Sequence, residues 1–325
     1  MMCCLEVFYA SVPFEQLCDS DDDEDDIPNF ENDFGRNQVQ KANWQVMNIS
    51  TPANYFHALR RQQHRDFRKP LVIASPKNLF RLRQCVSPLA DMGPGVRFKR
   101  LIPERDPEIT ANPDEVDRLV FCSGKLYYEL VAEREQLGLK NVAIVTLEQI
   151  APFPFDRVKT MMEMFPNVDM GDGVHPGNVI WCQEEPKNMG AWSYVRPRFV
   201  TTAREGLDKD MVMRYVGRRA AASPATGYPK LHNAEQEALV KVLFVSDAVL
   251  KRWWDTTMRA GLSSGPTRCW ATKPEVKAVA ANSGVSSELS ACIALSLAKS
   301  LFVQRLSASG AAIVNESAGN GIPVS

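Results

Sequence analysis

A dense group of cationic side chains lies between residues 60 and 83. It comprises Arg60, Arg61, His64, Arg65, Arg68, Lys69, Lys77, Arg81 and Arg83. Planar guanidinium groups bind phosphate and carboxylate in a bidentate manner, so the group suits an anion site or a contact with another subunit. Cations near the carboxy-terminal end of a helix are also favoured by the helix dipole, and a solvated surface explains the same residues. The sequence leaves both interpretations open.

Two further groups place polar side chains where strands are expected to end. Gly124-Lys125 would offer backbone N–H groups and an ammonium group to a phosphate, but the repeated glycines of a phosphate-binding loop are absent. Glu184 and Glu185 end an apolar run, and the nearby cations are Lys187, Arg196 and Arg198. We favour a structural ion pair or a subunit contact for these carboxylates, since no histidine converges on them.

No catalytic or metal-binding constellation can be assembled from the sequence. There is no Ser/His/Asp arrangement and no nucleophile elbow, and the eight cysteines lack zinc-ligand spacing, so we expect reduced thiols. His57 follows Tyr55 and Phe56 and is expected to be packed in the interior. His175 lies in residues 166–177, which are rich in glycine and proline and predict an exposed loop. We therefore predict no catalytic residue and no metal ligand.

The composition is typical of a soluble globular protein. Hydrophobic residues make up 45% and charged residues 24% of the 325 positions, so a sizeable core is possible. The net charge of −1 gives no field that would attract nucleic acid or an anionic membrane. No apolar run reaches the roughly 20 residues that cross a bilayer. We expect neither nucleic acid nor a membrane as a partner.

Alternating strands and helices are expected to position the polar groups. Residues 44–49 alternate as a strand, residues 52–63 form a helix capped by Thr51, and residues 70–75 form an apolar strand. After a segment rich in proline and glycine, the same alternation returns. Its expected strands and helices are residues 118–123, 125–137, 142–147, 155–165 and 179–183. The pattern predicts an α/β fold, with a mainly parallel sheet covered by helices on both faces.

The two ends of the chain depart from this pattern. Residues 19–26 hold seven carboxylates in eight positions, a composition that repels itself and cannot bury apolar surface. Beyond residue 246 the sequence is rich in serine and alanine, with one amphipathic helix expected at residues 288–306. We predict that residues 1–35 are a disordered, acidic segment and that residues 246–325 are a poorly ordered tail.

Six motifs follow one another in a fixed order. They are STPANYFHALRRQ at residues 50–62, RDFRKPLVIASPKNL at 65–79, FCSGKLYYEL at 121–130, EQIAPFPF at 148–155, WCQEEPKNMG at 181–190 and YVGRRAAASPATG at 215–227. In this order they resemble the thiamine-dependent, decarboxylating first component of 2-oxoglutarate dehydrogenase. The resemblance runs from about residue 15 to residue 243, with residues 170–178 as an insertion.

The resemblance implies a transketolase-like architecture. Residues 36–85 would be the end of the thiamine-pyrimidine-binding domain, and residues 86–245 the carboxy-terminal domain, which packs dimers and in some members binds an acidic effector. The family uses thiamine diphosphate and Mg²⁺ to decarboxylate 2-oxoglutarate in the citric-acid cycle. It implies a homodimer in the mitochondrial matrix, although no transit peptide is visible. The implied partners are a lipoyl-bearing succinyltransferase, which receives the succinyl group, and dihydrolipoamide dehydrogenase.

Two parts of the family pattern are missing from these 325 residues. They are the diphosphate and magnesium site, and the HGxxGQGPEHSS stretch that carries the family's catalytic histidine. We expect this chain alone to bind no cofactor and to be inactive, because nothing would generate or stabilise the ylid. The 2-oxoadipate enzyme remains a close alternative, although residues 54–57 and 65–69 favour the 2-oxoglutarate enzyme. A different hypothesis is a non-catalytic dimerisation or effector-binding module that uses Arg60 and Arg61.

Overall fold

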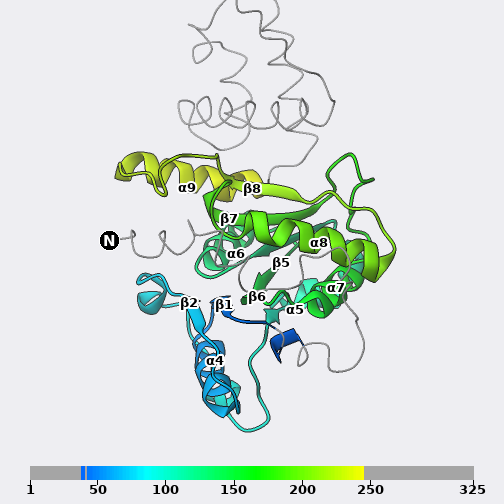
Figure 1. Cartoon of the computed structure of the whole chain (residues 1–325). Coiled ribbons are helices and arrows are strands. Elements are labelled where there is room, and N and C mark those ends of the chain that lie inside the picture. The colour runs from blue at the N-terminus through cyan, green and yellow to red at the C-terminus, as the bar shows by residue number, and fades with distance from the viewer. Residues whose placement is uncertain (1–37, 41, 245–325) are drawn as a thin grey trace, which may run out of the picture. The chain divides into compact units, whose positions relative to one another are not determined.

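The computed structural model of the chain describes residues 38–40 and 42–244. Within them, two sheets organise the fold (Figure 1). The strand order of the smaller sheet is β2 (Leu71–Ala74), β1 (Gln45–Asn48) and β6 (Gln149–Ala151). That of the larger sheet is β3 (Leu101–Ile102), β5 (Val142–Leu147), β4 (Arg118–Cys122), β7 (Val179–Pro186) and β8 (Arg214–Arg218).

The smaller sheet is built around a β-α-β unit. Helix α4 (Pro52–His64) connects the parallel strands β1 and β2, as the sequence predicts. Thr51 caps the helix, since its hydroxyl accepts a hydrogen bond from the Asn54 backbone N–H at 3.3 Å, and a proline stands at the first helical position. Strand β6, about a hundred residues further on, pairs antiparallel with β1. Sequence patterning did not predict this third strand.

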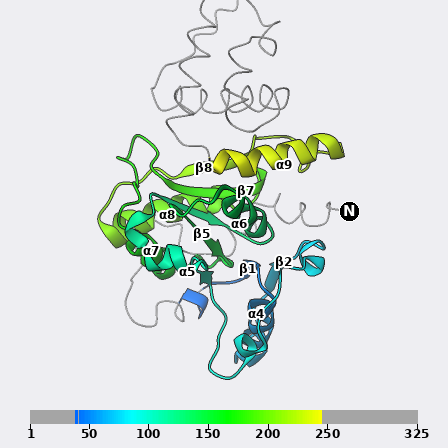
Figure 2. The same ribbon diagram turned by 180° about the vertical axis from the view of Figure 1, so that it is seen from behind.

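Helices cover both faces of the larger sheet. Strands β4, β5, β7 and β8 are parallel, and β3 alone runs antiparallel to its neighbour β5. Figures 1 and 2 show α8 (Trp192–Leu207) on one side and α6 (Leu126–Leu137) on the other. Helix α7 (Phe155–Met164) packs with α8, and α9 (Pro229–Phe244) packs with α6. The predicted fold class is confirmed.

Strand β4 shows why this sheet is buried on both sides. Leu119 and Phe121 belong to the core under α7 and α8, whereas Val120 and Cys122 belong to the core under α6 and α9. Each of these four side chains is at most 1% exposed. A strand with two covered faces is apolar at every position rather than at alternate ones, and this explains the continuous apolar runs of the sequence.

Several elements were not predicted from the sequence. They are β3, β6, β8, α8, α9, the short helix α5 (Pro107–Ala111) and the 3₁₀ turns η1 (Leu79–Arg81), η2 (Leu89–Met92) and η3 (Pro113–Glu115). Helix α8 holds Pro197 in its interior, and proline is a poor indicator of helix. No helix in the described part has the length and apolar character to cross a membrane. The predictions for residues 1–35, 246–325 and 288–306 lie outside the described residues.

Candidate functional site

The order of the larger sheet defines a topological switch point between β4 and β7. After β4 the chain continues to β5 on one side, and it later returns to β7 on the other side. Open α/β sheets bind ligands outside the carboxyl ends of the strands at such a point. Lys125 follows the end of β4, and Glu184 and Glu185 lie in the last part of β7. Three of the residues singled out from the sequence therefore meet at this edge.

Lys125 is held in ion pairs at the switch point. Its ammonium lies 2.9 Å from the Glu129 carboxylate and 3.4 Å from that of Glu184. Burial lowers the pKa of Lys125, but the two carboxylates outweigh this effect, so the pKa is raised overall. Glu184 also lies 3.9 Å from both Arg218 and His232. These partners come from β8 and α9, not from the cations near Glu184 in the sequence.

The turn between β4 and α6 is fixed by contact with β1. Gly124 has a φ of +59°, and a Cβ there would lie 2.2 Å from the Asn48 side-chain oxygen. The Asn48 amide donates a hydrogen bond to the Ser123 hydroxyl at 3.0 Å. A glycine is therefore required both for the left-handed backbone and for the close approach of the smaller sheet. Glu185 contributes its backbone carbonyl, which accepts from the Tyr215 hydroxyl at 3.1 Å.

Arg61 is the centre of the cationic group on α4. Its guanidinium donates to the side-chain oxygens of Gln45 and Gln149, each at 2.9 Å, and lies 4.1 Å from the Phe98 ring centroid. Burial, with the positive charges of Arg65 and Arg100 nearby, lowers the pKa of Arg61 to about 9. Arg61 thus links α4 to strands β1 and β6.

The other predicted cations of this group are more peripheral. Arg65 donates to the Gln45 side chain at 2.8 Å, and burial lowers its pKa. Arg60 donates to the Val96 carbonyl at 2.8 Å. His64 and Lys77 are exposed. The eight residues selected from the sequence consequently divide between α4 and the switch point, with His64 and Lys77 on the surface.

A buried carboxylate, Glu148, was missed by the sequence analysis. It is 0% exposed and accepts hydrogen bonds from the Ser50 backbone N–H at 2.9 Å, the Ser50 hydroxyl at 2.5 Å and the Asn54 amide at 2.9 Å. Arg105 donates to the same hydroxyl at 2.9 Å. Burial raises the pKa of Glu148 in spite of these donors. Its position between an apolar strand and the motif IAPFPF was a signal, but the partner residues lie about a hundred positions away.

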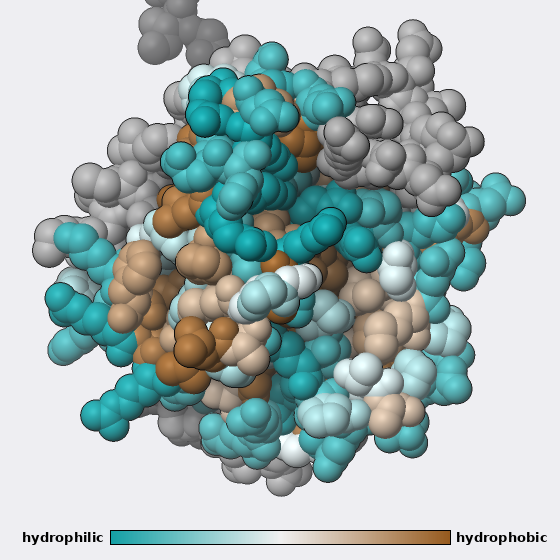
Figure 3. All heavy atoms as spheres, turned by 90° about the horizontal axis from the view of Figure 1, so that it is seen from below, coloured by the Kyte–Doolittle hydropathy of each residue, from teal (hydrophilic) through white to brown (hydrophobic). Residues whose placement is uncertain are grey.

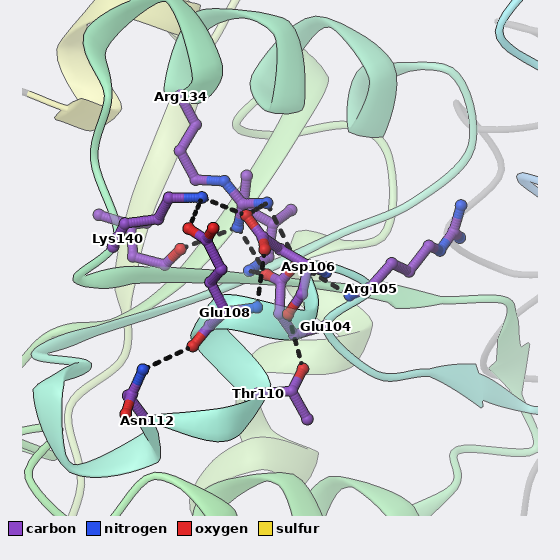
Figure 4. Close-up of polar contacts among 10 residues, drawn as sticks. Glu104, Arg105, Asp106, Glu108, Thr110, Asn112, Arg134 and Lys140 are labelled. Atoms are coloured by element: carbon purple, nitrogen blue, oxygen red, sulfur yellow. Dashed lines mark hydrogen bonds and ion pairs between the residues drawn. The ribbon is translucent and has the colours of Figure 1, made fainter.

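A second buried carboxylate, Glu104, joins β3 to α6 and β5 (Figure 4). One of its oxygens lies 2.6 Å from the Arg134 guanidinium and 2.6 Å from the Ile144 backbone N–H. The other accepts from the backbone N–H groups of Arg105 and Asp106, each at 2.8 Å. Each carboxylate oxygen of Glu104 accepts two or more hydrogen bonds from groups of the protein itself. This cluster is therefore structural.

Two cavities in the described part have linings whose charged side chains are mainly carboxylates. No group of three metal-binding side chains occurs among the described residues. A cavity of about 270 Å³ between α6 and α9 is lined by Glu129, Glu133 and Glu237. Another, of about 350 Å³, is lined by the carboxylates of Asp169, Asp172 and Asp210 and by one cation, Lys209. Both linings carry an excess of carboxylates, which repel a diphosphate.

Comparison with known protein families agrees with this architecture. Residues 86–244 match the family model described as 2-oxoglutarate dehydrogenase C-terminal, and residues 27–83 match the model described as transketolase, pyrimidine binding domain. The fold and these matches define a class, namely thiamine-dependent proteins of the transketolase type.

Individual relatives narrow the class to one family. The chain is 46% identical over 222 residues to "2-oxoglutarate dehydrogenase, mitochondrial" of Dictyostelium discoideum, covering 68% of this chain and 20% of the relative. It is 45% identical over 226 residues to "2-oxoglutarate dehydrogenase-like, mitochondrial" of Xenopus laevis, covering 69% and 21%. The chain therefore belongs to the 2-oxoglutarate dehydrogenase family and corresponds to a carboxy-terminal portion of it. It spans about a fifth of the length of the curated relatives that it matches.

Proposed function

We propose that this chain is part of the decarboxylating subunit of 2-oxoglutarate dehydrogenase. In the complete subunit, thiamine diphosphate and Mg²⁺ supply the chemistry that removes CO₂ from 2-oxoglutarate. The observation that carries the proposal is the 41–47% identity, over about 70% of the chain, to relatives named 2-oxoglutarate dehydrogenase or 2-oxoglutarate dehydrogenase-like. The residues of this chain then serve packing, through the buried Glu148, Arg61 and Glu104 contacts, rather than a chemical step.

The described portion acts, on this proposal, as a homodimer in the mitochondrial matrix. Its partners in the complex are the lipoyl-bearing succinyltransferase and dihydrolipoamide dehydrogenase. Support comes from the names of the relatives, which describe mitochondrial 2-oxoglutarate dehydrogenases. Blotting a lysate with an antibody against residues 100–240 measures the size of the natural polypeptide. A band far above 36.3 kDa is expected, whereas a band at that mass favours a separate, non-catalytic protein.

We also propose that the purified chain is inactive by itself. The 325 residues lack the HGxxGQGPEHSS stretch, and the cavities described above are acidic. The test is CO₂ release from 2-oxoglutarate with thiamine diphosphate and Mg²⁺ added, with the Dictyostelium enzyme as the positive control. We expect no release above background. Cofactor-dependent release by the chain would overturn this proposal.

The alternative function is binding of an anionic effector at the arginine group of α4. The observation that favours it is the convergence of Arg61, Arg65 and Arg100, whose mutual repulsion contributes to the lowered pKa of Arg61. Arg60→Glu with Arg65→Glu tests it more selectively than a change at Arg61, which is engaged with Gln45 and Gln149. Calorimetry with inorganic phosphate should show binding to the unchanged chain and none to this variant. No binding to the unchanged chain removes the alternative.

A further inference from the structure

The region around α4 carries a large excess of positive charge. Residues 60–100 contain eleven Lys and Arg side chains and only two carboxylates, although the whole chain has a net charge of −1. Six of these cations are exposed, namely Arg68, Lys77, Arg81, Arg83, Arg97 and Lys99. We call these six residues the basic surface.

Segments of the basic surface that are distant in sequence pack against the same helix. Tyr55 on α4 contacts Phe80 of η1, with ring centroids 6.1 Å apart. Asn54 exchanges hydrogen bonds with the backbone of Lys99, at 2.8 and 2.9 Å. Arg81, Arg83, Arg97 and Lys99 form no ion pair with another residue in the described ranges. Their charges are therefore available to an external anion.

Apolar side chains are exposed among these cations. Phe80, Val86 and Leu89 are 67%, 71% and 83% exposed, and Phe56 and Leu59 on α4 are also exposed. Figure 3 shows apolar side chains gathered beside hydrophilic ones on the face viewed from below. An exposed apolar patch with a charged border is typical of an interaction surface. Its occupant must combine negative charge with apolar groups.

The chain itself contains such a segment. The first 35 residues hold eleven carboxylates and no Lys or Arg, and Ile27, Phe30 and Phe34 follow the acidic run at residues 19–26. The segment joins the described chain next to the basic surface, because the Lys69 ammonium donates to the backbone carbonyls of Val39 and Ala42. Asp26 precedes Gln38 by twelve residues, which span about 40 Å when extended. Helix α4 is only about 20 Å long.

We propose that residues 19–34 bind to the basic surface of the same chain. Single exposed ion pairs are weak, but many charges act together here, and a short tether gives an effective concentration on the order of millimolar. The bound segment covers the exposed aromatic residues and neutralises the surface. Another anion, such as a polyphosphate, then has to displace it.

Carbodiimide coupling tests the contact in the intact chain. This reagent joins a carboxylate to a lysine only where the two touch. We expect residues 19–26 to couple to Lys77 and Lys99 about tenfold more than to Lys209 and Lys230, which are exposed elsewhere, and the excess to disappear in 1 M salt, where charges are screened beyond about 3 Å. Equal coupling to all four lysines would overturn the proposal.

A charge variant and an isotope mixture complete the test. Arg81→Gln, Arg83→Gln and Arg97→Gln together should reduce coupling to Lys77 and Lys99 severalfold. The matched control, Arg157→Gln, Arg196→Gln and Arg204→Gln, removes three exposed arginines elsewhere and should leave it unchanged. In a mixture of ¹⁵N-labelled and unlabelled chains, coupled peptides should carry a single label. Mixed labels at the statistical frequency would show binding between chains and contradict the proposal.

Discussion

Single residues at the junction of the two sheets combine several constraints. Gly124 illustrates this, because its positive φ and its contact with Asn48 both exclude a side chain. Glu148 is another case, since a buried carboxylate is tolerated only with its hydrogen-bond donors in place. Both residues lie within motifs on which the resemblance to the family rests, and the structure shows a physical role for each residue.

Replacing Gly124 should destabilise the protein more than replacing a glycine with the same φ in open space. Gly124→Ala adds a clash with Asn48 to the backbone strain, and we expect a loss of about 3 kcal/mol. Gly138 has a φ of +64° and nothing within 4 Å of a Cβ, so Gly138→Ala should lose only about 1 kcal/mol. Urea unfolding measures both. If Asn48→Ala does not partly rescue Gly124→Ala, the clash is not the cause.

Glu148 should make stability depend on pH. Its pKa is raised in the folded state, so the folded chain binds the proton more tightly than the unfolded chain. The contribution of Glu148 to stability is therefore complete below the unfolded pKa, near 4.3, and declines as the pH rises through the folded pKa. Glu148→Gln should remove this decline and, by facing an amide toward N–H donors, lower stability by roughly 1–3 kcal/mol. Urea titrations from pH 4 to 8 measure the slope, and an unchanged slope in the variant would refute the assignment.

At the scale of elements, Arg218 provides polar contacts that help to attach α9 to the sheet. Arg218 at the end of β8 donates to the Gln236 side chain at 2.9 Å and to the Glu184 carbonyl at 2.9 Å. The apolar side of α9, with Leu239, Val240 and Leu243, packs in the core with α6. The helix is thus held at its polar side by a group that short-range patterning cannot identify.

Removing the Arg218 head group should loosen α9 selectively. Arg218→Met keeps the apolar stem, and the loss of roughly 1.5 kcal/mol of charged hydrogen bonding should speed amide exchange in α9 about tenfold. Exchange in β5 should not change. Arg219→Met, at the exposed neighbouring position, is the matched control. Hydrogen exchange by mass spectrometry decides the matter, and equal acceleration in both variants would argue against this attachment.

Local signals predicted some elements well and others poorly. Strand β5 agrees with its predicted range at both ends, and α4 and α7 agree within one residue, because caps and apolar runs act over a few positions. Strand β6 is three residues long and exists only because β1 lies opposite it. For the same reason, the cations near Glu184 in the sequence are not the partners that the structure gives it. Lys125 and Arg218 lie beside Glu184 because β4 and β8 flank β7 in the sheet. Contacts between distant segments leave no periodic trace in the sequence.

At the scale of the described chain, the pairing of β6 with β1 means that the chain cannot be divided into two domains at one point of the sequence without separating paired strands. We predict a domain boundary near residue 86, yet β6 belongs to the later segment and completes the sheet of the earlier one. Arg61 reinforces the junction through Gln149. The two predicted domains therefore share a sheet.

Residues 86–244 alone should be less stable than residues 38–244. Without β1, strand β6 exposes an open edge, and Glu148 loses the donors of Ser50 and Asn54. We expect a lower urea midpoint and a tendency to aggregate in the shorter fragment. Unfolding followed by tryptophan fluorescence and by circular dichroism compares the two fragments. Identical midpoints would mean that residues 86–244 fold independently of the smaller sheet.

The shared sheet also bears on how such proteins can be recombined. A chimera that joins residues up to 85 from one relative to residues from 86 onward of another would match Gln45 and Arg61 with a foreign Gln149. What has to be kept together from one parent is the set of positions that contact one another across β1 and β6. It is not a continuous stretch of sequence between two domain boundaries. Successful crossovers should preserve that set, wherever along the chain the join is made.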